Sequence, residues 1–206
     1  LTSIEIPAGV TSIGDSAFSV SGLTSVIFVG SSQLTSIVSK AFLGTALTSI
    51  TLPDSLESIG SYAFHSASSL TSITIPSTVV SIGSNAFRST TELKTVTFEE
   101  NSELTSIGSY AFQYSGLTSI TLPNSLESIG EYVFRGATKL ETVTFDPGSQ
   151  LTSIGASAFR DASALTSITI PEGVTSIGNS VFRSTTELKT VTFDPGSKLT
   201  SIGDEA

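Results

Sequence analysis

Residues Leu70–Phe87 read LTSITIPSTVVSIGSNAF, and variants of this stretch recur along the whole chain. In its first half, Leu70, Ile73 and Ile75 are apolar, and most of the residues between them are Ser or Thr. Its second half is the string Ser-Ile-Gly-x-x-Ala-Phe, which ends at Phe87. Repetition at a fixed period indicates a protein in which one short unit is stacked many times.

Each copy opens at a leucine, and successive openings are 22, 24, 23, 23, 24, 23, 25 and 23 residues apart. Leucine-rich repeats have periods of about 20 to 29 residues. We therefore predict that residues 1–206 form a single leucine-rich-repeat solenoid of about nine right-handed coils. The chain stops inside a copy, so we expect it to be a fragment of a longer array. The copies open at Leu1, Leu23, Leu47, Leu70, Leu93, Leu117, Leu140, Leu165 and Leu188.

The two halves of a copy predict different local structures. Apolar residues two apart, such as Ile73 and Ile75, indicate a short strand with one buried face, so we expect a parallel sheet along one face of the solenoid. The spacing of Gly60, Ala63 and Phe64 predicts a tight 3-10 helical turn, and the opposite face should hold such turns and short strands. One phenylalanine per turn should form a buried aromatic spine. The spine residues are Phe18, Phe42, Phe64, Phe87, Phe112, Phe134, Phe159 and Phe182.

The copies end their strands in two ways. Five end with an aliphatic residue and proline, as in Ile75-Pro76, and four end with phenylalanine, as at Phe98. Proline cannot donate a ladder hydrogen bond, so pairing should end there. The phenylalanine copies have longer loops, which suggests volume compensation in the core. Val38 replaces a repeated glycine, and we expect a distorted turn there because valine resists positive φ.

The composition excludes several functions. A net charge of -9 disfavours binding to nucleic acid or an anionic membrane. No apolar run approaches the roughly 20 residues that span a bilayer, so we expect no membrane insertion of this segment. The chain has no cysteine and one histidine, and no nucleophile–base constellation stands out, so we expect no enzyme. We expect neither cofactor nor metal, because the acidic loops lie in alternate coils about 10 Å apart.

The strings LTSITIP, SIGSNAF and SIGSYAF resemble the BspA-like leucine-rich repeats of bacterial and protist surface proteins. The resemblance covers the whole chain. It implies an extracellular or cell-surface protein that adheres to host proteins, matrix proteins or other cells. Family repeats often carry cysteine three residues after the phenylalanine, where this chain has small residues such as Ala67 and Thr90.

One column of strand residues should face outward and could dock a protein or glycan, with selectivity near Glu5 and Ile27, where the threonine pattern breaks. The alternative is that threonine is simply a good solvent-facing strand residue. A regular hydroxyl array also allows ice binding. The column consists of Glu5, Ile27, Thr51, Thr74, Thr97, Thr121, Thr144, Thr169 and Thr192.

A second candidate surface lies beside the aromatic spine. Tyr62, Tyr110 and Tyr132 share one repeat position and could anchor an interface or lie flat over the turn. Another column contains Arg88, Arg135, Arg160 and Arg183. The last three lie in consecutive coils and would favour an anionic partner unless Asp161, Glu131 and Glu187 neutralise them.

The sequence thus predicts a non-enzymatic binding or adhesion module of a cell-surface or secreted protein, with a macromolecular partner. The first alternative is a structural spacer or an array that self-associates through its uncapped ends. The second alternative is an ice-binding protein with a serine and threonine face.

Overall fold

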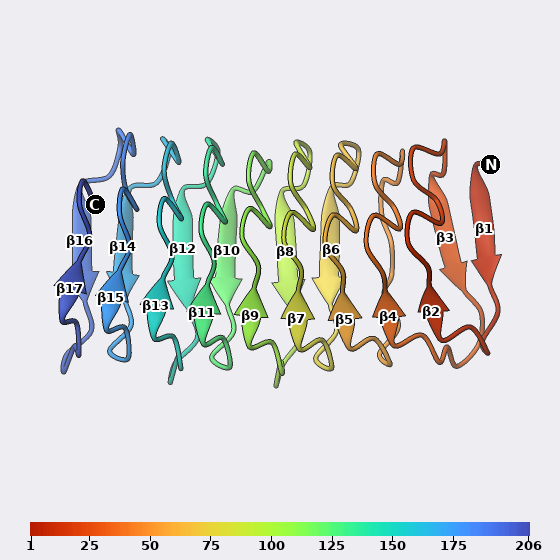
Figure 1. The fold of residues 1–206 in the computed structure, drawn as a ribbon, viewed down its shortest axis with the longest axis horizontal. Helices are drawn as coiled ribbons and strands as arrows, with labels where there is room; N and C mark the ends of the chain where they lie inside the picture. The colour runs from red at the N-terminus through yellow and green to blue at the C-terminus, as the bar shows by residue number, and fades with distance from the viewer.

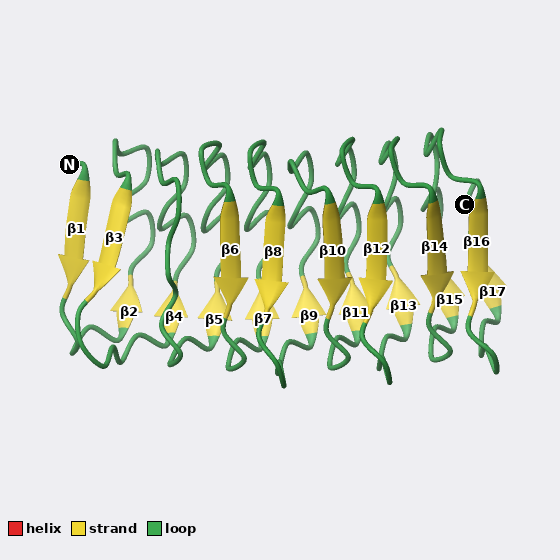
Figure 2. Cartoon of the chain, turned by 180° about the vertical axis from the view of Figure 1, so that it is seen from behind, coloured by secondary structure: helices red, strands yellow, loops and turns green.

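The computed structural model describes residues 1–206 and consists of strands and turns, with no helix. The coils stack in sequence order along the long axis of the molecule (Figure 1). Four-residue strands lie on one face, which we call the long-strand face, and two-residue strands lie on the other, the short-strand face (Figure 2). All strand pairs are parallel, which confirms the predicted leucine-rich-repeat solenoid.

Eight coils carry a strand on the long-strand face, and the third coil has only irregular backbone there, at residues 49–52. The long strands are β1 (Ser3–Ile6), β3 (Ser25–Phe28), β6 (Ser72–Ile75), β8 (Thr95–Phe98), β10 (Ser119–Leu122), β12 (Thr142–Phe145), β14 (Ser167–Ile170) and β16 (Thr190–Phe193). The short strands are β2 (Ser12–Ile13), β4 (Ser36–Ile37), β5 (Ser58–Ile59), β7 (Ser81–Ile82), β9 (Ser106–Ile107), β11 (Ser128–Ile129), β13 (Ser153–Ile154), β15 (Ser176–Ile177) and β17 (Ser201–Ile202).

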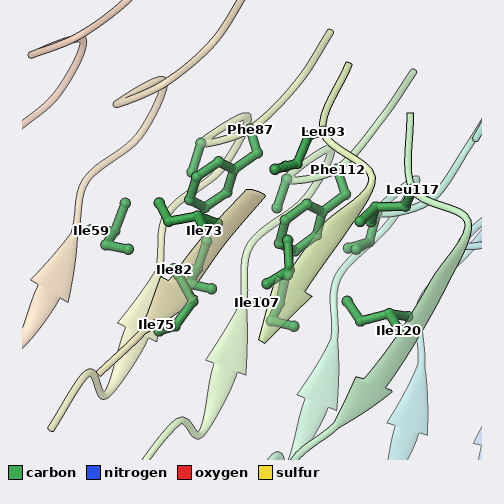
Figure 3. Close-up of a cluster of buried hydrophobic side chains, with 14 of the residues drawn as sticks. Ile59, Ile73, Ile75, Ile82, Phe87, Leu93, Ile107, Phe112, Leu117 and Ile120 are labelled. Carbon is green, nitrogen blue, oxygen red and sulfur yellow. The ribbon is translucent and has the colours of Figure 1, made fainter. Parts of the chain in front are cut away.

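The core is one cluster of 50 buried apolar residues that runs the length of the stack. Figure 3 shows part of it, around Phe87 and Phe112. Ile73 and Ile120 of the long strands are each 3% exposed, as the period-two pattern predicts. The predicted aromatic spine is confirmed: neighbouring rings have centroids 5.2 to 5.9 Å apart and planes within 13° of parallel. Each fully buried phenylalanine contributes about 1.5 to 3 kcal/mol, but only when neighbouring coils cover it.

The predicted 3-10 turns are wrong. In a 3-10 helix every N–H bonds to the carbonyl three residues earlier. Here Ala63 and His65 donate in that way, but Tyr62, Phe64 and Ser66 between them donate to carbonyls of the next coil at 2.7 to 2.9 Å. Two residues per turn also have positive φ, such as Tyr62 (60°) and Ser66 (55°), which interrupts any helix. The turns therefore form a third ladder between coils.

The distortion predicted at Val38 is also wrong. Val38 has no positive φ, and its N–H donates to the Ile13 carbonyl at 2.9 Å, just as Gly60 donates to Ile37 at 2.8 Å. Glycine serves a different purpose at this position: a Cβ on Gly108 would lie 2.6 Å from the Ser84 nitrogen of the preceding coil. Close approach of the coils, rather than backbone dihedral freedom, therefore explains most of the repeated glycines.

Candidate binding surfaces

The threonine column lies on the long-strand face and is exposed along its whole length. Glu5 pairs with Ile27 in strand register, and Thr74 pairs with Thr97. The hydroxyl groups of Thr121 and Thr144 lie 2.8 Å apart, as do those of Thr169 and Thr192. Much of the hydroxyl capacity of this column is therefore used between neighbouring coils.

The ladder on this face is interrupted. Four junctions are paired over four residues each: β1 with β3, β6 with β8, β10 with β12, and β14 with β16. Between these pairs, β8 and β10 are not bonded as strands, and β12 pairs with β14 over two residues only. Residues 49–52 pair with neither β3 nor β6. The short-strand face, in contrast, is one nine-stranded sheet.

A proline lies at each of the interruptions. In each phenylalanine copy, the residue after the strand donates its N–H to the strand-end carbonyl of the preceding coil: Glu99 donates to Ile75 at 3.1 Å, and Asp146 to Leu122 at 3.0 Å. Pro53, Pro76, Pro123 and Pro171 occupy the equivalent position in the other copies and have no N–H. Every incomplete junction involves one of these prolines. The long strands of the proline copies also end directly before them, as predicted.

Clefts open at these junctions, and we call them the proline-junction clefts. The largest, about 780 Å³, lies between β3 and residues 51–55 and is lined by Ile27, which is 50% exposed. A second, of about 670 Å³, lies between β8 and β10. A third, of about 380 Å³, separates residues 49–54 from β6. The break in the threonine column at Ile27 thus coincides with the largest cleft on this face.

The strand-end phenylalanines lie at the rims of these clefts. Phe28 lines the first cleft and Phe98 the second, and both rings are half-buried. In the proline copies, Ile75 and Leu122 at the same position are 0% exposed. The interpretation of volume compensation in the core is therefore wrong, because part of each larger ring points out of the core.

The second cleft is acidic. Glu99, Glu100 and Asp146 line it together with serine and threonine hydroxyls, and no lysine or arginine does. Glu99 also accepts a hydrogen bond from the Ser77 N–H at 3.0 Å. No group of three or more His, Cys, Asp or Glu side chains is arranged to hold a metal ion.

The turns carry the second candidate surface, which we call the tyrosine–arginine patch. The rings of Tyr110 and Tyr132 stack with centroids 4.8 Å apart and planes 5° from parallel. The guanidinium of Arg88 lies over the outer face of this pair at Tyr110, 5.9 Å from the centroid, and that of Arg135 lies 5.7 Å from the Tyr132 centroid. The patch consists of Tyr62, Arg88, Tyr110, Tyr114, Tyr132 and Arg135.

All four tyrosines of the chain have positive φ, between 56° and 63°. Bulky residues rarely adopt this conformation, which costs on the order of 1 to 3 kcal/mol for a residue other than glycine. Other coils place Ser, Asn, Lys or Glu at the position of Tyr62, Tyr110 and Tyr132. The Tyr114 ring also occupies the space beside Gly136, where a Cβ would lie 2.5 Å from the ring. The patch thus keeps large rings where other coils place smaller or more flexible side chains.

The arginine column divides into paired and unpaired members. Arg135 and Arg160 share Asp161, at 3.4 and 3.6 Å, and Arg183 pairs with Glu205 at 2.8 Å. The predicted neutralisation by Asp161 is present, whereas Glu131 and Glu187 make no ion pair, and the role of Glu205 was not predicted. Arg88 has no carboxylate within 4.0 Å.

Register explains why Arg88 lacks a partner. Arg135 pairs with Asp161, which lies two residues after the spine phenylalanine of the next coil. The equivalent residue for Arg88 is Tyr114. Comparing the two columns across successive coils is the sequence signal that distinguishes Arg88 from Arg135, Arg160 and Arg183, the other members of the predicted column.

His65 adjoins the patch. Its ring contacts Tyr62 edge-on, with centroids 5.6 Å apart, and its Nδ1 lies 3.1 Å from the Arg88 carbonyl oxygen. Burial lowers the pKa of His65 below its usual range, and the positive charge of Arg88 lowers it further. The hydrogen bond to the Arg88 carbonyl raises the pKa, but by less than burial lowers it. His65 is therefore held mainly in its neutral form at pH 7.

The stacked coils, the parallel ladders and the exposed columns define the class of the protein, a leucine-rich-repeat solenoid. The family model of the BspA type leucine rich repeat region, in six copies, matches residues 1–116 and 105–206. The chain therefore belongs to the BspA-type leucine-rich-repeat family. Leucine-rich-repeat proteins are generally non-enzymatic binding modules.

Solved structures agree with this assignment. The leucine-rich-repeat protein TpLRR of T. pallidum is 28% identical, with a TM-score of 0.67 over 76% of this chain and 73% of that one. The pneumococcal vaccine antigen PcpA is 25% identical, with a TM-score of 0.54 over 98% of this chain and 58% of that one. A leucine-rich-repeat protein from Eubacterium ventriosum shares the fold at 22% identity, with a TM-score of 0.54 over 93% of this chain and 66% of that one. No curated protein matches the chain.

Proposed function

We propose that this chain is a non-enzymatic binding module of a cell-surface or secreted protein and that it recognises a macromolecular partner, either a protein or a glycan. The observation that carries the proposal is the contrast between a continuous core and an exposed long-strand face with open clefts. The spine phenylalanines Phe42 to Phe159 are fully buried, while the threonine column and the rims of the clefts remain accessible.

The surroundings of the single histidine support a binding role over catalysis. His65 contacts the Arg88 carbonyl and, at 3.4 Å, the Ser66 hydroxyl, and no carboxylate completes this arrangement. Surface location is supported by family membership and by the description of PcpA as a vaccine antigen. The structure contains no helix that is long and apolar enough to cross a membrane.

The proposal is tested by immobilising the chain and probing it with arrays of purified extracellular proteins and of glycans. We expect at least one ligand well above the signal of an unrelated solenoid. A double variant, Thr97→Arg with Thr121→Arg, places two large cations beside the second proline-junction cleft and should weaken a ligand bound there. Thr152→Arg on the short-strand face is the matched control. A chain that captures nothing above background contradicts the proposal.

The two alternatives keep their own tests. A spacer or self-associating array predicts sedimentation that depends on concentration. Ice binding predicts thermal hysteresis, but the interrupted ladder does not favour it, because it breaks the regular spacing of about 4.8 Å that a continuous hydroxyl array would have.

A further inference from the structure

Residues 62–135 concentrate the aromatic polar residues of the chain on one flank. All four tyrosines, the single histidine and two of the arginines lie there, on the turns of the third to sixth coils. Contacts join them into one surface, because Tyr62 touches His65, His65 bonds to the Arg88 backbone, and Arg88 covers Tyr110. Tyrosine and arginine are among the residues most enriched in the energetically important contacts of protein interfaces.

The charges of the patch point to an anionic partner. The net charge of -9 opposes an anionic partner over most of the surface, so only an unpaired cation can attract one. Three of the four arginines have a carboxylate within 4.0 Å. Arg88 is the exception: its side chain is half-buried over Tyr110, and its only side-chain hydrogen bond is from Nη1 to the Asn85 amide oxygen at 3.3 Å. A guanidinium that is partly withdrawn from water and lacks a counter-charge can pair strongly with an incoming carboxylate.

The tyrosine geometry distinguishes between kinds of anionic partner. Sugars usually stack on the faces of aromatic rings, but the faces of Tyr110 and Tyr132 cover each other and are flanked by guanidinium groups. Only the ring edges and the two phenol hydroxyls remain available to a partner. Tyr110 and Tyr132 share one repeat position in adjacent coils and their rings stack. The pair therefore offers two O–H donors, the number that the two oxygens of one carboxylate can accept.

We propose, on the premise that the chain is a binding module, that the tyrosine–arginine patch docks an acidic segment of a partner protein, with Arg88 pairing with its carboxylate. Tyr110 and Tyr132 donate hydrogen bonds to the same group, and the exposed ring of Tyr114 contacts the apolar part of the segment. The stacking of Tyr110 on Tyr132 and the guanidinium groups beside them restrict these two rings before the partner arrives, so less side-chain freedom is lost on binding.

The test measures binding of the whole chain to immobilised poly-L-glutamate at 150 mM salt, with polygalacturonate as a carboxylated glycan for comparison. We expect binding to polyglutamate, and affinity for polygalacturonate at least about tenfold weaker. Arg88→Gln should lower the polyglutamate affinity about tenfold, and Arg88→Lys less, because lysine keeps the charge but loses the planar fork. The double variant Tyr110→Phe with Tyr132→Phe, which keeps both rings, should lower it several-fold.

Arg183→Gln is the matched control, because it removes an arginine of the same column that already pairs with Glu205, and its affinity should stay within about twofold. Circular dichroism of each variant checks that the array remains folded. Three results overturn the proposal: no binding to polyglutamate, equal binding by Arg88→Gln, or equal Arg88-dependent binding to polygalacturonate. One further outcome is that the arrays of purified proteins identify a partner that the Arg88→Gln variant binds as well as the unchanged chain does. In that case the proposed site is wrong, but the proposal that the chain is a binding module is unaffected.

Discussion

The two faces of the solenoid are built from the same repeat but differ in continuity. The short-strand face is one sheet of nine two-residue strands, whereas the long-strand face breaks into two pairs of strands and one four-stranded sheet, with clefts at the breaks. The difference has a local cause. On one face glycines let the coils approach closely, and on the other prolines remove one donor from four of the eight junctions. A single repeat can therefore hold the stack together on one side and leave openings on the other.

The largest effect should come from the interior that both faces share. Phe112 is fully buried between Phe87 and Phe134, with ring centroids 5.2 and 5.7 Å away. Phe112→Ala leaves a large cavity in the middle of the spine, and we expect the free energy of unfolding to fall by about 4 kcal/mol. Urea denaturation followed by circular dichroism measures the change.

Phe98→Ala is the matched comparison at the rim of a cleft. The Phe98 ring is half-buried, so its removal should cost only about 1 to 2 kcal/mol. Equal losses at the two positions would mean that the rim is as tightly packed as the spine, and the contrast between interior and cleft would be lost.

The second prediction concerns the close approach of coils on the short-strand face. A Cβ on Gly108 would lie 2.6 Å from Ser84 N and 2.9 Å from Gly83 C, so Gly108→Ala requires these two coils to shift. Val38 carries a Cβ at the same repeat position, so the junction between the first two coils already accommodates one. We expect a loss of about 2 kcal/mol in the free energy of unfolding. Gly14→Ala should have little effect, because a Cβ at Gly14 would have no neighbouring atom within 4 Å. A tolerated Gly108→Ala would assign the repeated glycine to another cause.

The sequence predicts the regular features of the molecule because they depend on periodicity. The spacing of Ile73, Ile75 and Phe87 is enough to expect parallel coils, a buried spine and an exposed threonine column. The two consequences that rest on single residues divide: proline correctly predicts the end of pairing, but Val38 does not distort its turn.

The features that sequence reasoning misses depend on contacts between coils. The spacing of Gly60, Ala63 and Phe64 fits a 3-10 turn, but spacing within one copy does not reveal that every second N–H bonds to the next coil. The isolation of Arg88 likewise follows from what the next coil places opposite it, Tyr114 in place of an aspartate. To predict either feature, one must know which residues of neighbouring coils lie opposite each other in space.

The third prediction tests proline as the cause of the clefts. Pro123→Ala restores an N–H opposite the Phe98 carbonyl, and we expect that bond to form and to draw β10 towards β8. Hydrogen exchange measured by NMR should then find a slowly exchanging amide at residue 123. The free energy of unfolding should change by less than about 1 kcal/mol, because the new bond offsets the greater freedom of the unfolded chain.

Pro147→Ala is the control, since Pro147 lies in an exposed loop beyond the strand end. Its new amide should exchange rapidly. If the amide at residue 123 also exchanges like that of an exposed loop, the missing donor is not what keeps the junction open, and the shape of the adjacent Phe98 loop becomes the explanation to test.

The smallest expected effect is a loss of stability at acidic pH. This loss should begin on the turns and not on either strand face. Because the pKa of His65 is lowered in the folded chain, the unfolded chain binds the proton more readily. The stabilising contribution of neutral His65 is thus fully present above the unfolded pKa of about 6.5 and is lost as pH falls through and below that value. We expect the melting temperature to fall slightly between pH 7.5 and 5.5, with faster hydrogen exchange first at the turns of the third and fourth coils.

His65→Gln separates this histidine from the other titrating groups. The same column carries glutamine at Gln113, two coils further along, so the turn accommodates that side chain. The variant should therefore fold normally and lose the part of the pH dependence that His65 supplies. An unchanged pH profile in His65→Gln would assign the acid sensitivity to the carboxylates of the acidic loops instead, and so to the long-strand face and its clefts.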